Sequence, residues 1–368
     1  MKSSTIVWIC GAATIILGFM GLIMLLDRQN KEDMVLHIGT YGSHIYRYGF
    51  DTGSLEFTLL EKIEAENASY AIKDADNIYA VSETGNASGA YSFSLGDETA
   101  MTADKRQTGA DPCFIMRYED WILTADYSGG SVTVFPLCDG ILGDCIQRLE
   151  LQGEGPVEGR QESSHIHQLK LIPDTDWILA SDLGADRIRL LRFEDGILVH
   201  KDDIVFPAGS GPRHLEFSRD GKTLYCISEL SGNVLVFSAG GNETPEFTLI
   251  QQIQADEVNA GGSADIHLHP SGKYLYTSHR LDNDGIAIFK TLPDGRIEKI
   301  GYSRTGRHPR NFCISPDGSL LFIACRDDRI IQVFHIEDDG HLTLTPSVLR
   351  FEEDMPSSIY ITDEKPSI

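Results

Sequence analysis

An arginine, a histidine and a glutamate stand at the two ends of one short stretch, GSGPRHLEFSRDGKTLYCISE, at residues 209–229. Apolar residues alternate on either side of its RDG turn, which predicts a β-hairpin. In an antiparallel hairpin the start of the first strand lies beside the end of the second, so Arg213 and His214 are expected next to Glu229. Guanidinium groups can hold negative charge, and an imidazole can move a proton near neutral pH. This end of the hairpin is therefore a candidate reaction site.

The same hairpin pattern recurs along the chain. Similar stretches stand at 67–83, 111–126, 164–182, 263–280 and 307–326. A second turn type also recurs, in steps of 43 to 56 residues, and its seven glycines are Gly53, Gly96, Gly140, Gly196, Gly241, Gly295 and Gly340. Seven repeats of about 48 residues, each with room for four strands, are typical of a β-propeller.

We therefore predict an all-β fold, a seven-bladed β-propeller of four-stranded antiparallel blades over residues 34–368. VLHIGT at 35–40 lacks the inner strand that precedes it in the other repeats, and SSIYIT at 357–362 can supply that strand. The C-terminal strand would then close the ring and leave few free sheet edges. WD-repeat signatures are missing. Two β-sandwiches are the alternative fold, but they would not explain seven evenly spaced repeats.

Alignment of the hairpins on their turns predicts that two sets of residues surround one mouth of the central channel. The starts of the innermost strands are Asn67, Asp111, His167, Arg213, Ala264, Arg310 and Pro356. The ends of the adjoining strands are Thr40, Glu83, Asp126, Asp182, Glu229, Arg280 and Arg326. Arginines aimed at a narrow axis repel each other unless acids or an anionic ligand offset them. Polar strand ends can also simply cap turns or meet solvent, and this explanation stays open for Asn67, Arg326 and the acids. Glu229 could likewise be only a counter-ion, and His167 only a hydrogen-bonding residue.

Two His-x-His pairs, His165 with His167 and His267 with His269, each place two imidazoles on one strand face. No third ligand stands at an obvious spacing, so packing or hydrogen bonding is favoured over a metal site. The motifs of serine hydrolases, zinc proteases, P-loop proteins and dinucleotide-binding folds are absent. We expect neither a metal nor an organic cofactor.

Composition narrows the choice of partners. The chain of 368 residues carries a net charge of −24, which argues against nucleic-acid binding. An anionic ligand would need a local cluster of arginine or histidine. The cysteines form no C-x-x-C pair. Cys138 with Cys145, and Cys313 with Cys325, could be disulfides or simply small buried side chains.

An uncharged apolar segment, IVWICGAATIILGFMGLIMLL, stands at residues 6–26. At about 1.5 Å per residue it could cross a bilayer core of about 30 Å. It has no clean cleavage site, so an uncleaved transmembrane helix within residues 1–33 is favoured over a signal peptide. The flanking positive charges, Lys2 before it and Arg28 and Lys31 after it, are nearly balanced. We expect a membrane-anchored protein whose body lies outside the cytoplasm, on the periplasmic side, with the cytoplasmic side as the alternative.

The chain resembles a known group, the seven-bladed propeller lactonases, which includes propeller-type 6-phosphogluconolactonases and carboxy-muconate lactonizing enzymes. The matching stretches are SHIHQ around His167, SDLGADRI (181–188), GSGPRH (209–214), SEL (228–230), ADIHLHPSGKYLYTSHR (264–280) and HPRNFCISPDG (308–318). The resemblance covers about residues 34–362. It implies that the catalytic residues are His167, Arg213, Glu229 and Arg280, and that Arg310 is a further pocket arginine. From their place at the same mouth, the other expected substrate contacts are Asn67, Asp111, Asp182, His165 and Arg326.

The resemblance implies a hydrolase that opens a sugar-acid lactone, phosphorylated or not. His167 is expected as the general base, because the ordinary pKa of histidine is about 6.5. Arg213 and Arg280 would hold the developing negative charge, and Glu229, its pKa lowered by arginines, would orient His167 or an arginine. A muconate-type lactonizing cycloisomerase and a non-catalytic ligand-binding propeller are the alternatives. The expected partner is a small-molecule lactone, bound by a monomeric propeller.

Overall fold

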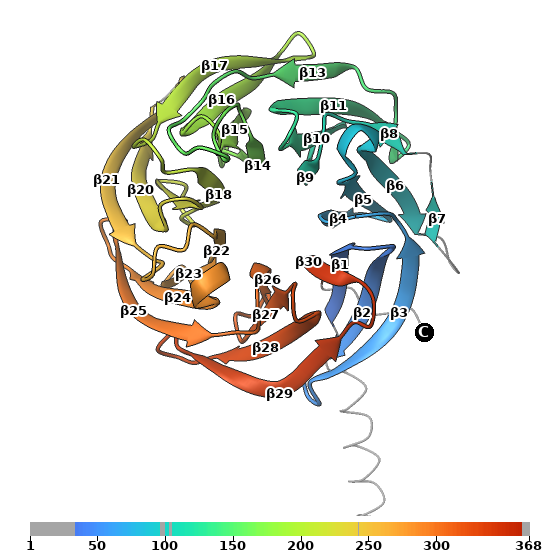
Figure 1. Cartoon of the computed structure of the whole chain (residues 1–368), viewed down its shortest axis with the longest axis vertical. Helices are drawn as coiled ribbons and strands as arrows, with labels where there is room; N and C mark the ends of the chain where they lie inside the picture. Colours follow the sequence, from blue (N-terminus) through green and yellow to red (C-terminus); the bar gives the residue numbers. More distant parts are fainter. Residues whose placement is uncertain (1–33, 96–99, 103–104, 242, 363–368) are drawn as a thin grey trace, which may run out of the picture.

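The strands of the protein are arranged as blades around one axis (Figure 1). The structure, a computed structural model, describes residues 34–95, 100–102, 105–241 and 243–362. Within these residues the strands form seven separate antiparallel sheets. This arrangement confirms the predicted seven-bladed β-propeller and rules out the two-sandwich alternative.

The strands of each blade follow one another from the axis to the perimeter. From the innermost strand outward, blade 1 consists of β30 (Met355–Thr362), β1 (Met34–Tyr41), β2 (His44–Asp51) and β3 (Glu56–Glu64). In the same order, blade 2 consists of β4 (Ala71–Asp74), β5 (Asn77–Ser82), β6 (Gly89–Leu95) and a split outer edge, β7 (Ala100–Thr102) and β8 (Arg106–Gln107). Blade 3 consists of β9 (Pro112–Tyr118), β10 (Trp121–Asp126), β11 (Ser131–Cys138) and a split outer edge, β12 (Ile141–Leu142) and β13 (Gln147–Glu150).

The remaining four blades have one outer strand each. Blade 4 consists of β14 (Ile166–Leu171), β15 (Trp177–Asp182), β16 (Arg187–Glu194) and β17 (Ile197–Val205). Blade 5 consists of β18 (Pro212–Phe217), β19 (Thr223–Ser228), β20 (Asn233–Gly240) and β21 (Glu246–Gln254). Blade 6 consists of β22 (Ser263–Leu268), β23 (Tyr274–His279), β24 (Gly285–Thr291) and β25 (Ile297–Arg304). Blade 7 consists of β26 (Pro309–Ile314), β27 (Leu320–Cys325), β28 (Ile330–Ile336) and β29 (Leu342–Arg350).

The ring closes through the C-terminal strand, as predicted. β30 pairs antiparallel with β1, and Ile359 lies opposite Ile38. Leu36 and Ile38 then pack in one apolar cluster with Phe322 and Ala324 of blade 7. Closure therefore joins the two ends of the chain both by strand pairing and by packing between blades.

Packing between neighbouring blades fixes the positions of the inner hairpins. All six residues of β15 and all six of β19 are buried, because these strands have a blade on each face. Trp177 and Leu190 of blade 4 share one apolar cluster with Leu215 and Phe237 of blade 5. A buried side chain of this size contributes about 1.5–3 kcal/mol. The clusters thus hold the strand ends in fixed places around the axis.

The inner hairpins turn in two different ways. In blade 2 the last paired residues are Asp74 and Asn77, so two residues form the turn, and blade 3 has a turn of the same length. In blade 5 the last pair is Phe217 and Leu224, and six residues lie between them. Fewer residues therefore separate the two ends of the inner hairpin in blades 2 and 3 than in blade 5.

The predicted membrane anchor is not supported. The described residues contain no helix that is long and apolar enough to span a bilayer. Their helices are two short 3-10 turns, η1 (Gly85–Ala87) and η2 (Leu281–Asn283), whereas a span needs about 20 residues. This finding contradicts the predicted location, which was anchored in a membrane with the body outside the cytoplasm. The segment 6–26, and with it the predicted boundary before residue 34, lies outside the described residues.

Neither of the two possible cysteine pairs is a disulfide. The six cysteines among the described residues are free. Cys313 lies opposite Phe322 on the neighbouring strand, while Cys325 lies opposite Pro309, so the two thiols are at different levels of the same ladder. Cys138 lies opposite Ile141 in a tight turn, with Cys145 beyond that turn.

Candidate active site

The inner hairpins end in a common pattern that points matching residues at one mouth of the ring. The N–H of Glu229 donates to the Gly211 carbonyl at 2.7 Å, and the N–H of Arg280 donates to the Gly262 carbonyl at 3.1 Å. By this pattern and the β1–β30 pairing, the residues equivalent to Glu229 are Tyr41, Glu83, Tyr127, Leu183, Arg280 and Arg326. Those equivalent to Arg213 are Ser69, Cys113, His167, Ala264, Arg310 and Ser357.

Three arginines hold the carboxylate of Glu229. Glu229 Oε2 lies 2.7 Å from Arg213 Nε and 2.9 Å from Arg280 Nη2. Glu229 Oε1 lies 2.5 Å from Arg160 Nη2. Burial by itself would raise the pKa of Glu229, but Arg280, Arg213 and Arg160 lower it to about 2. The carboxylate is therefore ionised at neutral pH and acts mainly through its charge.

His167 is a neutral imidazole close to this cluster. It is buried, and its ring meets the rings of Tyr127 and His214 edge to face, with centroids 5.7 Å and 5.1 Å away. Burial, followed by the positive charge of Arg213, lowers the pKa of His167 well below 6.5. Within the described residues, His167 Nδ1 has no hydrogen-bond partner. The ring is therefore neutral at pH 7, and one of its nitrogens is buried without a partner in the part of the chain that the structure describes.

Arg310 approaches the site from blade 7. Its guanidinium lies 5.2 Å from the ring centre of Tyr41, within cation–π range. The Tyr41 hydroxyl donates to the Glu83 carboxylate at 3.0 Å, and Ser69 donates to the same group. Burial raises the pKa of Glu83, and Arg310 opposes this rise. In the described part of the chain no acceptor is hydrogen-bonded to the Arg310 guanidinium, so its donors remain available to a ligand.

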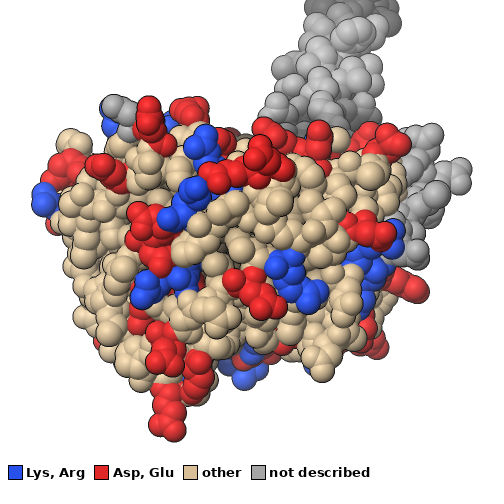
Figure 2. Space-filling view, turned by 90° about the horizontal axis from the view of Figure 1, so that it is seen from above, with Lys and Arg blue, Asp and Glu red and all other residues tan. Residues whose placement is uncertain are grey.

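These residues surround a pocket of about 250 Å³. Its lining residues are Tyr41, Glu83, Asp111, Cys113, Tyr127, Arg160, His167, Glu229, Arg280 and Arg310. Small-molecule sites are usually about 300–1,000 Å³, so this pocket suits a small ligand. The side of the molecule seen in Figure 2 carries many Asp and Glu side chains among fewer Lys and Arg, as expected from the acidic composition. Arginine is instead concentrated in the pocket, as an anionic ligand of this acidic chain would require.

A void of about 10 Å³ lies deeper in the ring. Arg213 and His214 line this void and not the larger pocket, while His167 lines both. Arg213 is fully buried and also donates to the Ala264 carbonyl at 2.5 Å. His214 Nδ1 is 2.6 Å from Asp265 Oδ1. Arg213 therefore acts on the pocket through Glu229 rather than by lining it.

Two predicted acids serve the fold and not the pocket. Asp182 is fully buried and pairs with Arg189 at 2.7 Å, and its other oxygen accepts the N–H of His165. Asp126 is also fully buried, where it accepts hydrogen bonds from Ser131 and Thr133. Each is the last residue of its strand, and in blade 3 the next residue, Tyr127, lines the pocket. A shift of one residue along a strand turns the side chain to the other face.

Three further predicted contacts lie outside the pocket lining. His165 stacks on the Tyr127 ring, with centroids 4.5 Å apart, and its Nδ1 is 2.8 Å from the Tyr127 carbonyl. Arg326 Nε pairs with Asp327 at 2.8 Å. Asn67 takes a positive φ of 45° before its strand begins. Of the predicted set, the structure brings together at the pocket His167, Glu229, Arg280, Arg310 and Asp111, with Arg213 beneath them.

Sequence reasoning missed several lining residues. Cys113 is the true equivalent of Arg213 in blade 3, but the shorter hairpin there moved the alignment by two residues, to Asp111. In the same blade the alignment placed Asp126 at the mouth, whereas the residue that lies there is the next one, Tyr127. A separate length allowed for each turn could have found both. Arg160 lies in the irregular connection between β13 and β14, for which no repeat pattern gives a signal.

The second His-x-His pair binds protein groups separately. His267 Nε2 lies 3.1 Å from Asp265 Oδ2, and His269 Nε2 lies 2.9 Å from the Gly318 carbonyl. Among the described residues no three His, Cys, Asp or Glu side chains are grouped so that they could hold a metal ion.

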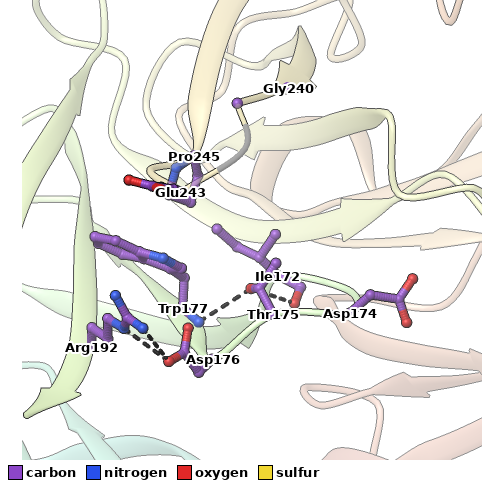
Figure 3. Close-up of a pocket in the computed structure, with 10 residues that line it drawn as sticks. Ile172, Asp174, Thr175, Asp176, Trp177, Arg192, Gly240, Glu243 and Pro245 are labelled. Atoms are coloured by element: carbon purple, nitrogen blue, oxygen red, sulfur yellow. Dashed lines mark hydrogen bonds and ion pairs between the residues drawn. The ribbon is translucent and has the colours of Figure 1, made fainter.

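A second pocket, of about 480 Å³, lies between the β14–β15 turn of blade 4 and the β20–β21 turn of blade 5 (Figure 3). The Arg192 guanidinium lies 5.5 Å from the Trp177 ring centre and pairs with Asp176 at 2.8 Å. The pocket is larger than the axial one. The described residues that line it include no histidine, whereas His167 in the axial pocket is buried among arginines.

Comparison with known proteins agrees with the fold. The family model described as "Lactonase, 7-bladed beta-propeller" matches residues 35–358. The 6-phosphogluconolactonase of Bacillus subtilis is 27% identical over 333 residues, which cover 85% of this chain and 94% of that protein. The 6-phosphogluconolactonase of Formosa agariphila is 29% identical over 328 residues, which cover 84% of this chain and 93% of that protein.

Solved structures show the same likeness. A candidate 6-phosphogluconolactonase from Bacteroides uniformis is 38% identical, with a TM-score of 0.85 over 90% of this chain and 100% of that one. The periplasmic gluconolactonase of Pseudomonas aeruginosa is 25% identical, with a TM-score of 0.79 over 89% of this chain and 99% of that one.

Proposed function

Because the chain belongs to the seven-bladed β-propeller lactonase family, we propose that it is a lactone hydrolase that opens a sugar-acid lactone in the axial pocket. The observation that carries this proposal is a pocket lined by both the neutral, buried His167 and a carboxylate held by three arginines. The relatives named as 6-phosphogluconolactonases favour ring opening over cyclisation.

His167 is the proposed general base. It takes a proton from a water molecule as that water attacks the lactone carbonyl, and it returns the proton to the ring oxygen when the C–O bond breaks. The low pKa of His167 keeps the ring neutral and ready at pH 7, although it also makes the free imidazole a weak base. An anion bound near the arginines would offset their charge and raise this pKa.

Arg280 is the proposed holder of the oxyanion. It lines the pocket, and its Nη2 is fixed on Glu229, which keeps the guanidinium in one orientation. Burial, with repulsion from Arg213 and Arg310, lowers the pKa of Arg280 to about 9, although Glu229 opposes this. Arg280 therefore stays charged at neutral pH, and a preorganised cation of this kind stabilises developing negative charge.

The charge of the site favours a lactone with an anionic substituent. Four arginines face three acids there, and burial raises the pKa of one of these acids, Glu83. Arg310, whose donors are available, is the proposed contact for the anionic group. A phosphorylated sugar lactone fits this description better than an uncharged one.

The test is hydrolysis of glucono-δ-lactone and of its 6-phosphate, measured against the spontaneous rate. We expect wild-type protein to open the 6-phosphate faster than the uncharged lactone, and His167→Ala and Arg213→Ala to lose most of this activity. Wild-type protein that opens neither lactone faster than Arg213→Ala would overturn the proposal.

A further inference from the structure

Three arginines, Arg160, Arg213 and Arg280, pair with Glu229 in the part of the chain that the structure describes. Of these, only Arg160 lies outside the inner hairpins. It lies in the connection between β13 and β14, and its side chain is 36% exposed, whereas those of Arg213 and Arg280 are 2% and 7% exposed. Arg160 thus lines the pocket from its open side.

The backbone that carries Arg160 is firmly held. The neighbouring Gln161 is fully buried, and its amide donates to the Leu183 carbonyl and to Asp186 Oδ1, both at 2.8 Å. Asp186 also accepts the N–H groups of Gly209 and Gly211, at 2.6 Å and 2.7 Å. One buried carboxylate therefore fixes both the Arg160 segment and the segment that leads into Arg213. Movement at Arg160 is left to its side chain.

The three ion pairs of Glu229 are not equivalent. Oε2 receives both buried arginines, while within the described residues Oε1 is hydrogen-bonded to Arg160 alone. Loss of the Arg160 contact would leave the carboxylate held by two arginines and would free one oxygen toward the pocket. Arg160 is the partly exposed partner. Breaking its ion pair therefore costs less free energy than breaking either of the two buried pairs.

We propose that Arg160 binds the anionic substituent of the substrate together with Arg310, by exchanging its ion pair with Glu229 for one with the ligand. The exchange releases Glu229 Oε1 to accept a hydrogen bond from the attacking water or from a substrate hydroxyl. Glu229 thereby competes with the ligand for Arg160. This inference rests on the proposed function and adds a specificity-determining residue to it.

The experiment compares wild type, Arg160→Gln and Arg160→Lys, with Arg187→Gln as the matched control. Arg187 is also a partly exposed arginine in an ion pair, with Asp203 at 2.8 Å, but it does not line the pocket. Glucose 6-phosphate and glucose serve as inert probes that differ only in the phosphate, and their Kd values are measured by calorimetry. The same variants are assayed on glucono-δ-lactone and its 6-phosphate.

Arg160→Gln should weaken glucose 6-phosphate binding by about 10- to 100-fold, the usual effect of one charge-assisted hydrogen bond. Arg160→Lys should restore part of the affinity because it keeps the charge, and Arg187→Gln should change it less than about threefold. The preference for the 6-phosphate over the uncharged lactone, as the ratio of kcat/KM values, should fall in Arg160→Gln by a similar factor. Glu229→Gln should bind glucose 6-phosphate more tightly than wild type where it folds, because the competitor is gone.

Equal glucose 6-phosphate affinity in wild type and Arg160→Gln would overturn this inference even if both lactones are hydrolysed. Wild-type protein inactive on both lactones would overturn the proposed function instead, and the binding comparison would still decide on Arg160.

Discussion

Arg213 Nε lies 2.7 Å from Glu229 Oε2 across the β18–β19 hairpin, and their side chains are 2% and 8% exposed. Both charges have lost nearly all their water, so each depends on the other and on Arg280 and Arg160. The pair is at once a structural support of the axis and the electrostatic centre of the proposed site.

Glu229→Gln should lower the free energy of unfolding by about 3–5 kcal/mol, because it leaves buried guanidinium groups without their counter-ion. Asp176→Asn, which removes a carboxylate from a half-exposed pair with Arg192, should cost less than about 1 kcal/mol. Urea denaturation of both variants measures the difference. Equal losses would show that the Glu229 charge is not needed for the fold.

Acid should destabilise wild type more than Glu229→Gln. The pKa of Glu229 is lowered from 4.5 to about 2, so this carboxylate stabilises the fold above pH 4.5 and loses that contribution as the pH falls toward 2. The contribution amounts to about 3 kcal/mol at most. Urea denaturation at pH 7, 5, 4 and 3 should show the stabilities of the two proteins converging as the pH falls. Parallel curves would contradict the lowered pKa.

His167→Gln should reduce kcat for lactone opening by about 10²–10⁴-fold, the usual contribution of a general base. His335 is an exposed histidine on β28, and His335→Gln should retain wild-type kcat. Initial rates at saturating lactone measure both. A kcat for His167→Gln within threefold of wild type would remove His167 from the mechanism.

Arg310→Ala should raise the KM for the phosphorylated lactone by about 10-fold or more, because it deletes a pocket cation. Arg326→Ala is the matched control at the other end of the same β26–β27 hairpin, where the guanidinium pairs with Asp327 and does not line the pocket. It should change KM by less than about threefold. An equal effect of the two substitutions would mean that only the overall charge matters.

Cys138 and Cys145 are exposed free thiols and should be alkylated by iodoacetamide in the native protein. Cys113 should react only after unfolding, because it is buried and burial raises its pKa. Mass spectrometry of tryptic peptides, with and without urea, measures the order. Early modification of Cys113 would show that the pocket opens more widely than this structure allows.

Much of the fold could be predicted from local periodicity. Alternating apolar residues and recurring turns identify each hairpin by itself, and seven such units with a spare C-terminal strand imply a closed ring. The proximity of Arg213 to Glu229 also follows from one hairpin, because antiparallel pairing places its two ends together. Placing His167, Arg280 and Arg310 at one mouth required only that the hairpins share an axis, whereas their proposed roles came from the family resemblance.

The rest depended on details that no single repeat contains. Tyr127 faces the pocket and Asp126 does not. Successive side chains of a strand point to opposite faces, so an error of one residue exchanges the two. Cys113 replaced Asp111 because the turn of blade 3 is shorter. Arg160 reaches Glu229 from an irregular segment that buried hydrogen bonds hold in place. The sequence by itself thus determined the ring and the residue types at its axis, because these follow from local pattern. Only the tertiary structure decided which side chains meet there, because that depends on turn lengths and on contacts between distant segments.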